Sequence, residues 1–392
     1  MTASGKSVWP LAFCAGLLGI GQNGLLVMLP QLVQMTGLTL STWAGLLMSG
    51  SMLFLPASPW WGRVSEVKGC KFVVVASLSG YLASFALLAL AVWLMAEKQL
   101  GIPAGVGVLI LSRTIYGLTV SGMVPAAQTW AMQRSGTEKR MAALAVISSG
   151  LSCGRLLGPP LAAFALSLYP MAPLWLMAAG PLFALIFISR QYGDPPLEAV
   201  THQAARWHSG LLPFLVLAAL LALCISLMQI GLAPALRDYM AAPAAVSRHI
   251  AWLLSLAAIA TLLAQFLIVR PQRLQIQPLL LSAAVLMSAG LGMMVAGNLP
   301  WLYAGIVVTS FGAAMATPAY QLLLNQKLSL GKGAGLIATS HTLGYGLSAL
   351  LIPVISWRWG QTHLLAGAWI ASAIFFIVAC RLRTTASAES AR

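Results

Sequence analysis

Residues 148–163 read SSGLSCGRLLGPPLAA and lie inside a long apolar run. Gly150, Gly154 and Gly158 recur at every fourth position, so on a helix they form one narrow face without side chains. Small residues in this arrangement let a second membrane helix approach backbone to backbone. The stretch therefore predicts a tightly packed helix crossing.

The same stretch carries a charge and two prolines. Arg155 directly follows the middle glycine, where a charge inside a membrane costs about 2.5–3.5 kcal/mol. We therefore expect a specific partner for Arg155. Pro159 and Pro160 follow the last glycine, and we expect them to bend or end the helix there.

The composition of the whole chain predicts an all-α integral membrane protein. Of its 392 residues 59% are hydrophobic and 7% are charged, whereas soluble domains are about 25% charged. We identify twelve apolar segments of about 20–27 residues, each long enough to cross the bilayer as a helix. The polar segment 191–209 predicts a cytoplasmic linker between six-helix halves at 1–190 and 210–392.

The net charge of +15 is located in the loops and does not indicate nucleic-acid binding. With a cytoplasmic N-terminus, sixteen of the 22 Lys and Arg residues fall on the cytoplasmic side. Four fall on the other side, namely Lys98, Arg237, Arg248 and Arg358. This asymmetry predicts that both termini are cytoplasmic. The five cysteines are scattered singly, so we expect neither a disulfide framework nor a metal site, and no cofactor.

The turn at residues 62–71, GRVSEVKGCK, resembles the loop 2–3 signature of the major facilitator superfamily. Gly62, Glu66, Gly69 and Lys71 fall in register, with glutamate in place of the family's aspartate. Glycine permits a tight turn, and an acid near the start of the next span favours the positive end of that helix. The resemblance implies a role for this loop in latching conformational states.

In span 4, residues 112–117 read SRTIYG and are similar to the superfamily's R-x-x-x-G signature through Arg113 and Gly117. The resemblance implies that Arg113 acts in proton transfer or in substrate handling. The alternative is a structural or snorkelling arginine.

In span 5, Gly154, Gly158 and Pro159 resemble the G-x-x-x-G-P-x-x-G signature of the superfamily's proton-coupled export branch, with Ala162 at the final glycine. The resemblance implies two six-helix halves of a major facilitator fold, which rock about a central site lined by spans 1, 4, 7 and 10. It also implies an efflux antiporter.

The second half weakly repeats the first, as expected of a duplicated transporter. The sequence PAAQ at 125–128 in span 4 returns as PAYQ at 318–321 in span 10. Uncharged polar residues inside the spans are candidates for substrate binding or for bridging helices, namely Gln22, Asn23, Gln128, Gln229 and Gln321. His341 and Tyr345 share a face of span 11, and both are candidates for substrate binding or coupling, with His341 also a candidate for proton binding. The alternative is a structural histidine.

No acid lies inside a predicted span; the seven acids are Glu66, Glu97, Glu138, Asp194, Glu198, Asp238 and Glu389. By contrast, Arg113 and Arg155 each lie inside a predicted span. We expect an anionic substrate to be the partner of these two arginines. Backbone carbonyls and hydroxyls such as those of Ser152 and Tyr116 are the alternative. If protons are exchanged, His341 is the first candidate carrier and Asp238 the second.

The sequence thus predicts a monomeric exporter of the cytoplasmic membrane that uses alternating access. Its expected partners are the bilayer, a small-molecule substrate and protons. The expected cargo is an organic anion, such as a polycarboxylate metabolite or a carboxylate siderophore. The alternatives are a multidrug/proton antiporter and a non-transporting sensor or scaffold. The spans lack the paired acids, metal ligands or nucleophile with a base that an enzyme needs.

Overall fold

The computed structural model describes residues 8–135, 140–192, 209–327 and 332–390. The chain divides between His202 and Gln203 into two compact units, each with its own core. This division falls within the predicted linker, most of which lies outside the described residues.

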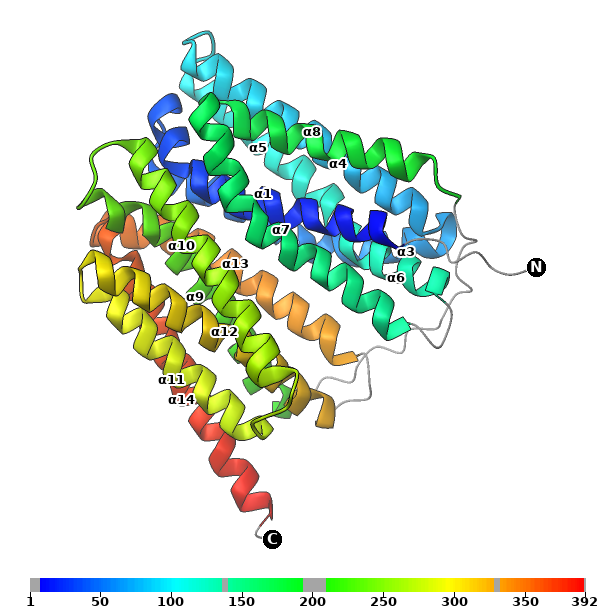
Figure 1. The fold of residues 1–392 in the computed structure, drawn as a ribbon, viewed down its shortest axis with the longest axis vertical. Helices are drawn as coiled ribbons and strands as arrows, with labels where there is room; N and C mark the ends of the chain where they lie inside the picture. Colours follow the sequence, from blue (N-terminus) through cyan, green and yellow to red (C-terminus); the bar gives the residue numbers. More distant parts are fainter. Residues whose placement is uncertain (1–7, 136–139, 193–208, 328–331, 391–392) are drawn as a thin grey trace. The chain divides into compact units, whose positions relative to one another are not determined.

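The described residues of unit 1 form eight helices, coloured blue to green in Figure 1. They are α1 (Trp9–Thr36), α2 (Leu40–Met52), α3 (Phe54–Lys68), α4 (Cys70–Ala96), α5 (Ile102–Val120), α6 (Met123–Ser135), α7 (Arg140–Leu168) and α8 (Ala172–Ser189).

Unit 2 is coloured green to red. Its elements are η2 (Ser209–Leu211), α9 (Leu212–Arg237), α10 (Pro243–Ala264), the π-helical turn η3 (Gln265–Val269), α11 (Ile276–Val295), α12 (Leu299–Lys327), α13 (Lys332–Arg358), η4 (Gln361–His363) and α14 (Leu364–Ser390).

The prediction of twelve membrane-spanning helices is confirmed. The described residues form twelve spans that are long and apolar enough to cross a bilayer. Three of these spans join two elements: α2 with α3, α5 with α6, and α10 with η3. The described part of the chain contains no strand. The fold is therefore an all-α membrane fold.

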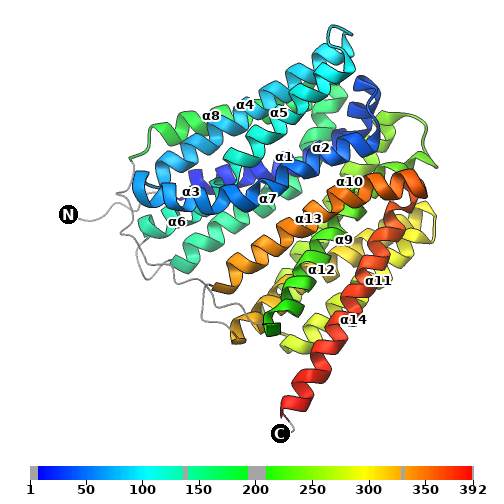
Figure 2. The ribbon, with the colours of Figure 1, turned by 180° about the vertical axis from the view of Figure 1, so that it is seen from behind.

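The two units use the same pattern of helix packing. In unit 1, α1 packs against α7 and α8, and α4 packs against α5 and α8. In unit 2, α9 packs against α13 and α14, and α11 packs against α12 and α14. Figures 1 and 2 show these neighbours side by side from opposite faces. Each helix of these pairs in unit 2 lies six spans after the corresponding helix of unit 1 in the sequence. A duplicated chain has this arrangement.

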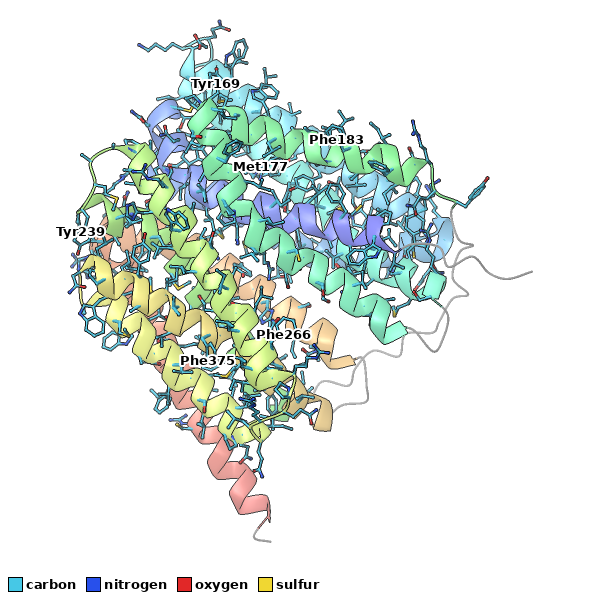
Figure 3. The ribbon with its side chains drawn as sticks, in the orientation of Figure 1. Tyr169, Met177, Phe183, Tyr239, Phe266 and Phe375 are labelled. Atoms are coloured by element: carbon cyan, nitrogen blue, oxygen red, sulfur yellow. The ribbon has the colours of Figure 1, made fainter. Side chains whose placement is uncertain are left out.

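Side chains divide between the interior and the outside as expected of a membrane protein. In Figure 3, Phe375 of α14 is labelled and is fully buried, whereas Phe183 of α8 and Phe266 of η3 are exposed. Large exposed apolar side chains are unfavourable in water but stable against lipid. The exposed faces of both units therefore suit a bilayer.

Two local predictions require correction. Of the bend or end expected at Pro159 and Pro160, the end is excluded, because α7 continues to Leu168. Neighbouring helices can stabilise prolines within membrane spans. The predicted turn at 62–71 is also mostly helical, because α3 extends to Lys68. The chain turns at Gly69, where φ is +81° and glycine avoids the strain of a side chain.

Candidate functional site

The glycine face of α7 packs directly against α1. A Cβ atom on Gly154 would overlap the carbonyl oxygen of Gly16, and one on Gly158 would lie 2.9 Å from the Cα of Ile20. Gly150 makes a similar approach one turn earlier. The two backbones therefore touch, and the predicted crossing has span 1 as its partner.

Arg155 lies near the middle of the span Val146–Leu168, but its side chain is exposed on the protein surface rather than buried. A position inside a span therefore does not bury this guanidinium within the protein. Its main-chain oxygen accepts a hydrogen bond from Asn23 Nδ2 of α1 at 2.9 Å. No described residue forms an ion pair or a hydrogen bond with its guanidinium. Arg155 thus presents an unpaired positive charge at mid-span.

Arg113 on α5 has a different environment. Its side chain is 4% exposed, and its Nη2 donates to the hydroxyls of Ser84 at 2.9 Å and Ser112 at 3.2 Å. The guanidinium also lies 5.1 Å from the ring centres of Phe85 and Tyr116, a cation–π distance. Its Nε has no hydrogen-bond partner. Hydroxyls and aromatic rings of the same unit therefore surround this charge. Tyr116, whose hydroxyl was the expected partner, contacts the guanidinium with its ring.

Gly117, the second residue of the span 4 signature, lies at the crossing of α5 and α2. A Cβ atom there would overlap the carbonyl oxygen of Gly50 and lie 2.8 Å from the Cβ of Leu53. Gly50 in turn faces the carbonyl oxygen of Arg113, 3.1 Å from where its own Cβ would be. The arginine and the glycine of the signature thus fix one helix crossing.

Span 4 is interrupted between α5 and α6, a break that its continuous apolar pattern did not predict. Trp61 Nε1 donates to the carbonyl oxygen of Leu118 at 2.6 Å, and Ser77 Oγ donates to that of Thr119 at 2.8 Å. These carbonyls lie at the end of α5, where the helical hydrogen-bond pattern stops before α6 begins at Met123. Donors from neighbouring spans therefore satisfy them, as a membrane interior requires. Pro125 lies just after the break and removes the helical bond to the carbonyl of Ser121, four residues earlier.

The loop signature contributes to a cluster of cations at the end of α8. Lys71 Nζ donates to the carbonyl oxygen of Ser189 at 2.9 Å and also to that of Gln191. Arg134 donates to the carbonyl oxygen of Tyr192 at 2.9 Å and to the Gln191 side chain. Cations stabilise the negative end of a helix. Gly62 and Glu66 of the signature lie on α3.

His341 of α13 is half-buried and hydrogen-bonded to α12. Its Nε2 lies 2.5 Å from the hydroxyl oxygen of Tyr320. Tyr320 is fully buried, and the same hydroxyl oxygen lies 3.1 Å from Thr317 Oγ1. Tyr345 is half-buried one turn after His341. Tyr320 belongs to the repeated PAYQ motif, but nothing in the sequence indicated that it meets His341.

The remaining candidates are distributed over both units. Gln22 is exposed on α1, whereas Gln128 on α6, Gln229 on α9 and Gln321 on α12 are half-buried. Among the described acids, Glu66 is in the last turn of α3, and Glu97 and Asp238 cap the C-terminal ends of α4 and α9. Glu138, Asp194 and Glu198 lie outside the described residues, and Glu389 is in α14. The described residues contain no cluster of His, Cys, Asp and Glu that could hold a metal ion.

The sequence is similar to bacterial transporters. The multidrug resistance protein MdtG of Proteus mirabilis is 27% identical over 195 residues, which cover 47% of this chain and 44% of that protein. MdtG of Enterobacter lignolyticus is 28% identical over 196 residues, with the same coverage. The chain thus matches less than half the length of these curated relatives.

Solved structures share the fold at low identity. A bacterial homologue of the iron transporter ferroportin, in an inward-facing state, has a TM-score of 0.73 at 16% identity and covers 94% of this chain and 98% of its own. The human organic anion transporter MFSD10 has a TM-score of 0.63 at 18% identity, with coverage of 95% and 98%. The family model of the Major Facilitator Superfamily matches residues 11–330. Together with the twelve spans and the repeated packing, this match shows that the chain belongs to the major facilitator superfamily of membrane transporters.

Proposed function

We propose that this transporter exports a small organic anion, such as a polycarboxylate metabolite or a carboxylate siderophore, across the bacterial cytoplasmic membrane by alternating access. Both termini are cytoplasmic in this proposal, as the distribution of Lys and Arg indicates. The transporter acts as a monomer, and protons are its candidate coupling ion.

The observation that carries the proposal is the unpaired charge of Arg155. Arg113 has hydroxyl and aromatic partners within its own unit, but the guanidinium of Arg155 has none among the described residues. A mid-span charge is costly unless it has a function or a partner. A carboxylate substrate supplies such a partner, because the planar guanidinium binds carboxylates through two parallel hydrogen bonds.

The membrane potential favours this direction of transport. Moving one negative charge out of a cytoplasm that is negative inside gains about 2.3 kcal/mol per 100 mV. Export of an anion therefore needs little proton exchange. Among the described residues, the acids lie at helix ends, so a fixed carboxylate for a cationic drug is not found at mid-span.

Multidrug efflux is the second candidate. It is supported by the names of the MdtG relatives and by the glycine-proline signature in α7. Both candidates are exporters and share the helix crossing of α1 and α7. They differ in the charge of the cargo, which makes them separable by experiment.

The first prediction concerns Arg155. A strain that lacks the gene is complemented with the wild-type protein, Arg155→Ala, Arg155→Lys or the control Arg190→Ala, which changes an exposed arginine at the end of α8. Untargeted mass spectrometry of the medium measures exported carboxylates. We expect Arg155→Ala to lower their export at least about tenfold, the cost of one charge-assisted hydrogen bond of ~1.5 kcal/mol. Arg155→Lys should retain part of it.

The outcome separates the two candidates. The wild-type protein and Arg190→Ala should restore export equally, with equal amounts of each protein in the membrane. Full export by Arg155→Ala would exclude the anion proposal. Loss of ethidium efflux in the deletion strain, without a change in exported carboxylates, would favour multidrug transport instead.

A further inference from the structure

Tyr81 of α4 joins span 1 to the side chains around Arg113. Its hydroxyl donates to the main-chain oxygen of Leu17 on α1 at 2.8 Å, and its side chain is 1% exposed. Its ring centre lies 4.8 Å from that of Phe85 and 5.7 Å from that of Tyr116. These two rings flank the guanidinium of Arg113. Tyr81 therefore contacts span 1 through its hydroxyl and the neighbours of Arg113 through its ring.

The direction of the hydrogen bond to Leu17 is fixed by its chemistry. A carbonyl oxygen can only accept, so the phenol must donate. A buried tyrosine hydroxyl is unfavourable without a partner, and the two neighbouring rings restrict where the Tyr81 ring can lie. Tyr81 therefore presents its hydroxyl at one place, and α1 must lie where Leu17 can meet it.

The contacted segment of α1 has few side chains of its own. Residues 16–24 read GLLGIGQNG, and four of these nine residues are glycine. Such a segment packs closely but offers few side chains that interlock with its neighbours. A Cβ atom on Gly21 would overlap the hydroxyl oxygen of Tyr81, so Gly21 leaves the space that this hydroxyl occupies. The position of the segment therefore depends on contacts that other helices make with its backbone.

Another face of the same segment lies against the main chain of α7. A Cβ atom on Gly19 would lie 2.5 Å from the main-chain nitrogen of Arg155 and 2.8 Å from the carbonyl carbon of Gly154. Asn23 Nδ2 donates to the main-chain oxygen of Arg155. At 3.6 residues per turn, this face is about a third of a turn from the face that Tyr81 contacts. A shift of the segment at one of these faces therefore changes the contact at the other.

We propose that Tyr81 is a positioning residue for Arg155. Its hydroxyl holds residues 17–23 of α1 in one position, and this segment in turn fixes where the main chain of Arg155 lies. All of these residues belong to unit 1. The inference rests on the proposed function, in which the guanidinium of Arg155 attracts an anion. Loss of the Tyr81 hydroxyl should therefore weaken the attraction of anions to span 1 although no charge is removed.

A thiol introduced by Gln22→Cys tests the proposal without a known cargo. Gln22 is exposed on α1 and directly precedes Asn23. The full-length protein also carries Cys153→Ser and Cys380→Ser, which remove the two native cysteines that are not buried. In lipid nanodiscs, the rates of reaction with an anionic and a cationic methanethiosulfonate are measured, each divided by the rate with 2-mercaptoethanol. A general loosening of the fold raises both rates together, whereas their ratio reports the charge of Arg155.

The ratio of the anionic to the cationic rate should depend on both residues. We expect Arg155→Ala to lower it at least about fivefold, since a charge about 10 Å away attracts one reagent and repels the other. Tyr81→Phe keeps the ring and should lower the ratio at least about twofold, because the loss of one hydrogen bond shifts a population by about fivefold. Tyr169→Phe is the matched control, and this exposed tyrosine after the end of α7 is labelled in Figure 3. It should leave the ratio unchanged.

Gly21→Ala gives a second, independent test. The new Cβ atom needs the space of the Tyr81 hydroxyl, so Gly21→Ala alone should lower the ratio as Tyr81→Phe does. In the Tyr81→Phe protein this space is empty, and Gly21→Ala should have little further effect. The two substitutions are thus expected to be non-additive.

The outcomes separate this inference from the proposed function. If Arg155→Ala lowers the ratio but Tyr81→Phe does not, the anion site stands and Tyr81 does not position it. Additive effects of Gly21→Ala and Tyr81→Phe would also overturn the inference, because the two residues would then not share one contact. If Arg155→Ala leaves the ratio unchanged, or if the introduced thiol reacts with neither reagent, the proposed anion site fails and this inference fails with it.

Discussion

The two arginines within the spans illustrate how neighbouring side chains determine the role of the same residue type. Arg113 is 4% exposed and bonded to Ser84 and Ser112 between two aromatic rings. Arg155 is exposed and has no side-chain partner among the described residues. The first therefore joins α4 and α5, whereas the side chain of the second makes no such contact within its unit.

This difference predicts different effects on stability. Arg113→Ala should remove two hydrogen bonds to a charged group, about 2–3 kcal/mol, and lower the melting temperature of the purified protein by several degrees. Arg155→Ala should change it little, because no contact is lost. Thermal unfolding in nanodiscs, followed by intrinsic fluorescence, measures both. Equal melting temperatures for Arg113→Ala and the wild-type protein would show that Arg113 does not hold these helices together.

At the scale of the helix, the glycine face of α7 allows direct backbone contact with α1. A new Cβ atom at Gly154 would overlap the main chain of Gly16, which cannot rotate away as a flexible side chain can. Overpacking of this kind costs about 1–3 kcal/mol. A sliding or rocking contact between two helices also needs a surface without interlocking side chains. The crossing can therefore serve both packing and movement.

We predict that Gly154→Ala lowers export and that Gly154→Leu abolishes it, because both substitutions force α7 away from α1. Gly107→Leu on α5 is the matched control, since a Cβ atom there meets nothing within 4 Å. Export of the identified cargo, normalised to protein in the membrane, is the measurement. Normal export by Gly154→Leu would mean that transport does not depend on this contact.

At the scale of the whole chain, each unit contains a close crossing of its first and fifth spans. In unit 2, a Cβ atom on Gly344 of α13 would overlap the carbonyl oxygen of Ala219 of α9. One turn later, the hydroxyls of Ser348 and Ser226 lie 2.6 Å apart and both residues are fully buried. Unit 2 thus adds a hydroxyl pair where unit 1 relies on backbone contact.

The repeat predicts that substitutions at equivalent glycines have equivalent effects. Gly344→Leu should lower export as Gly154→Leu does, although the two residues are in different units. Gly45→Leu on α2 provides a control, because a Cβ atom there also meets nothing within 4 Å. The same export assay applies. A Gly344→Leu protein with wild-type export would restrict the functional crossing to unit 1.

Much of the fold followed from local patterns. Apolar segments long enough to cross a bilayer predicted the twelve spans, and the glycines at 150, 154 and 158 predicted a close crossing. Such patterns are reliable because in a membrane the length and polarity of each segment largely determine whether it spans. The sequence left open whether the helix ends at Pro159 and Pro160 or only bends there, because the support for prolines inside a span comes from neighbouring helices.

The partners of individual side chains depended on tertiary structure. Ser84 lies 29 residues from Arg113, and the hydroxyl of Tyr320 reaches His341 across 21 residues. Trp61 reaches the carbonyl of Leu118 across 57 residues. Hydrogen bonding needs atoms within about 3 Å, and only the packing of the helices brings residues so far apart in the chain to that distance. The sequence by itself therefore determined the spans, the glycine face and the presence of two mid-span arginines, whereas the tertiary structure decided which arginine is paired and which histidines meet a tyrosine.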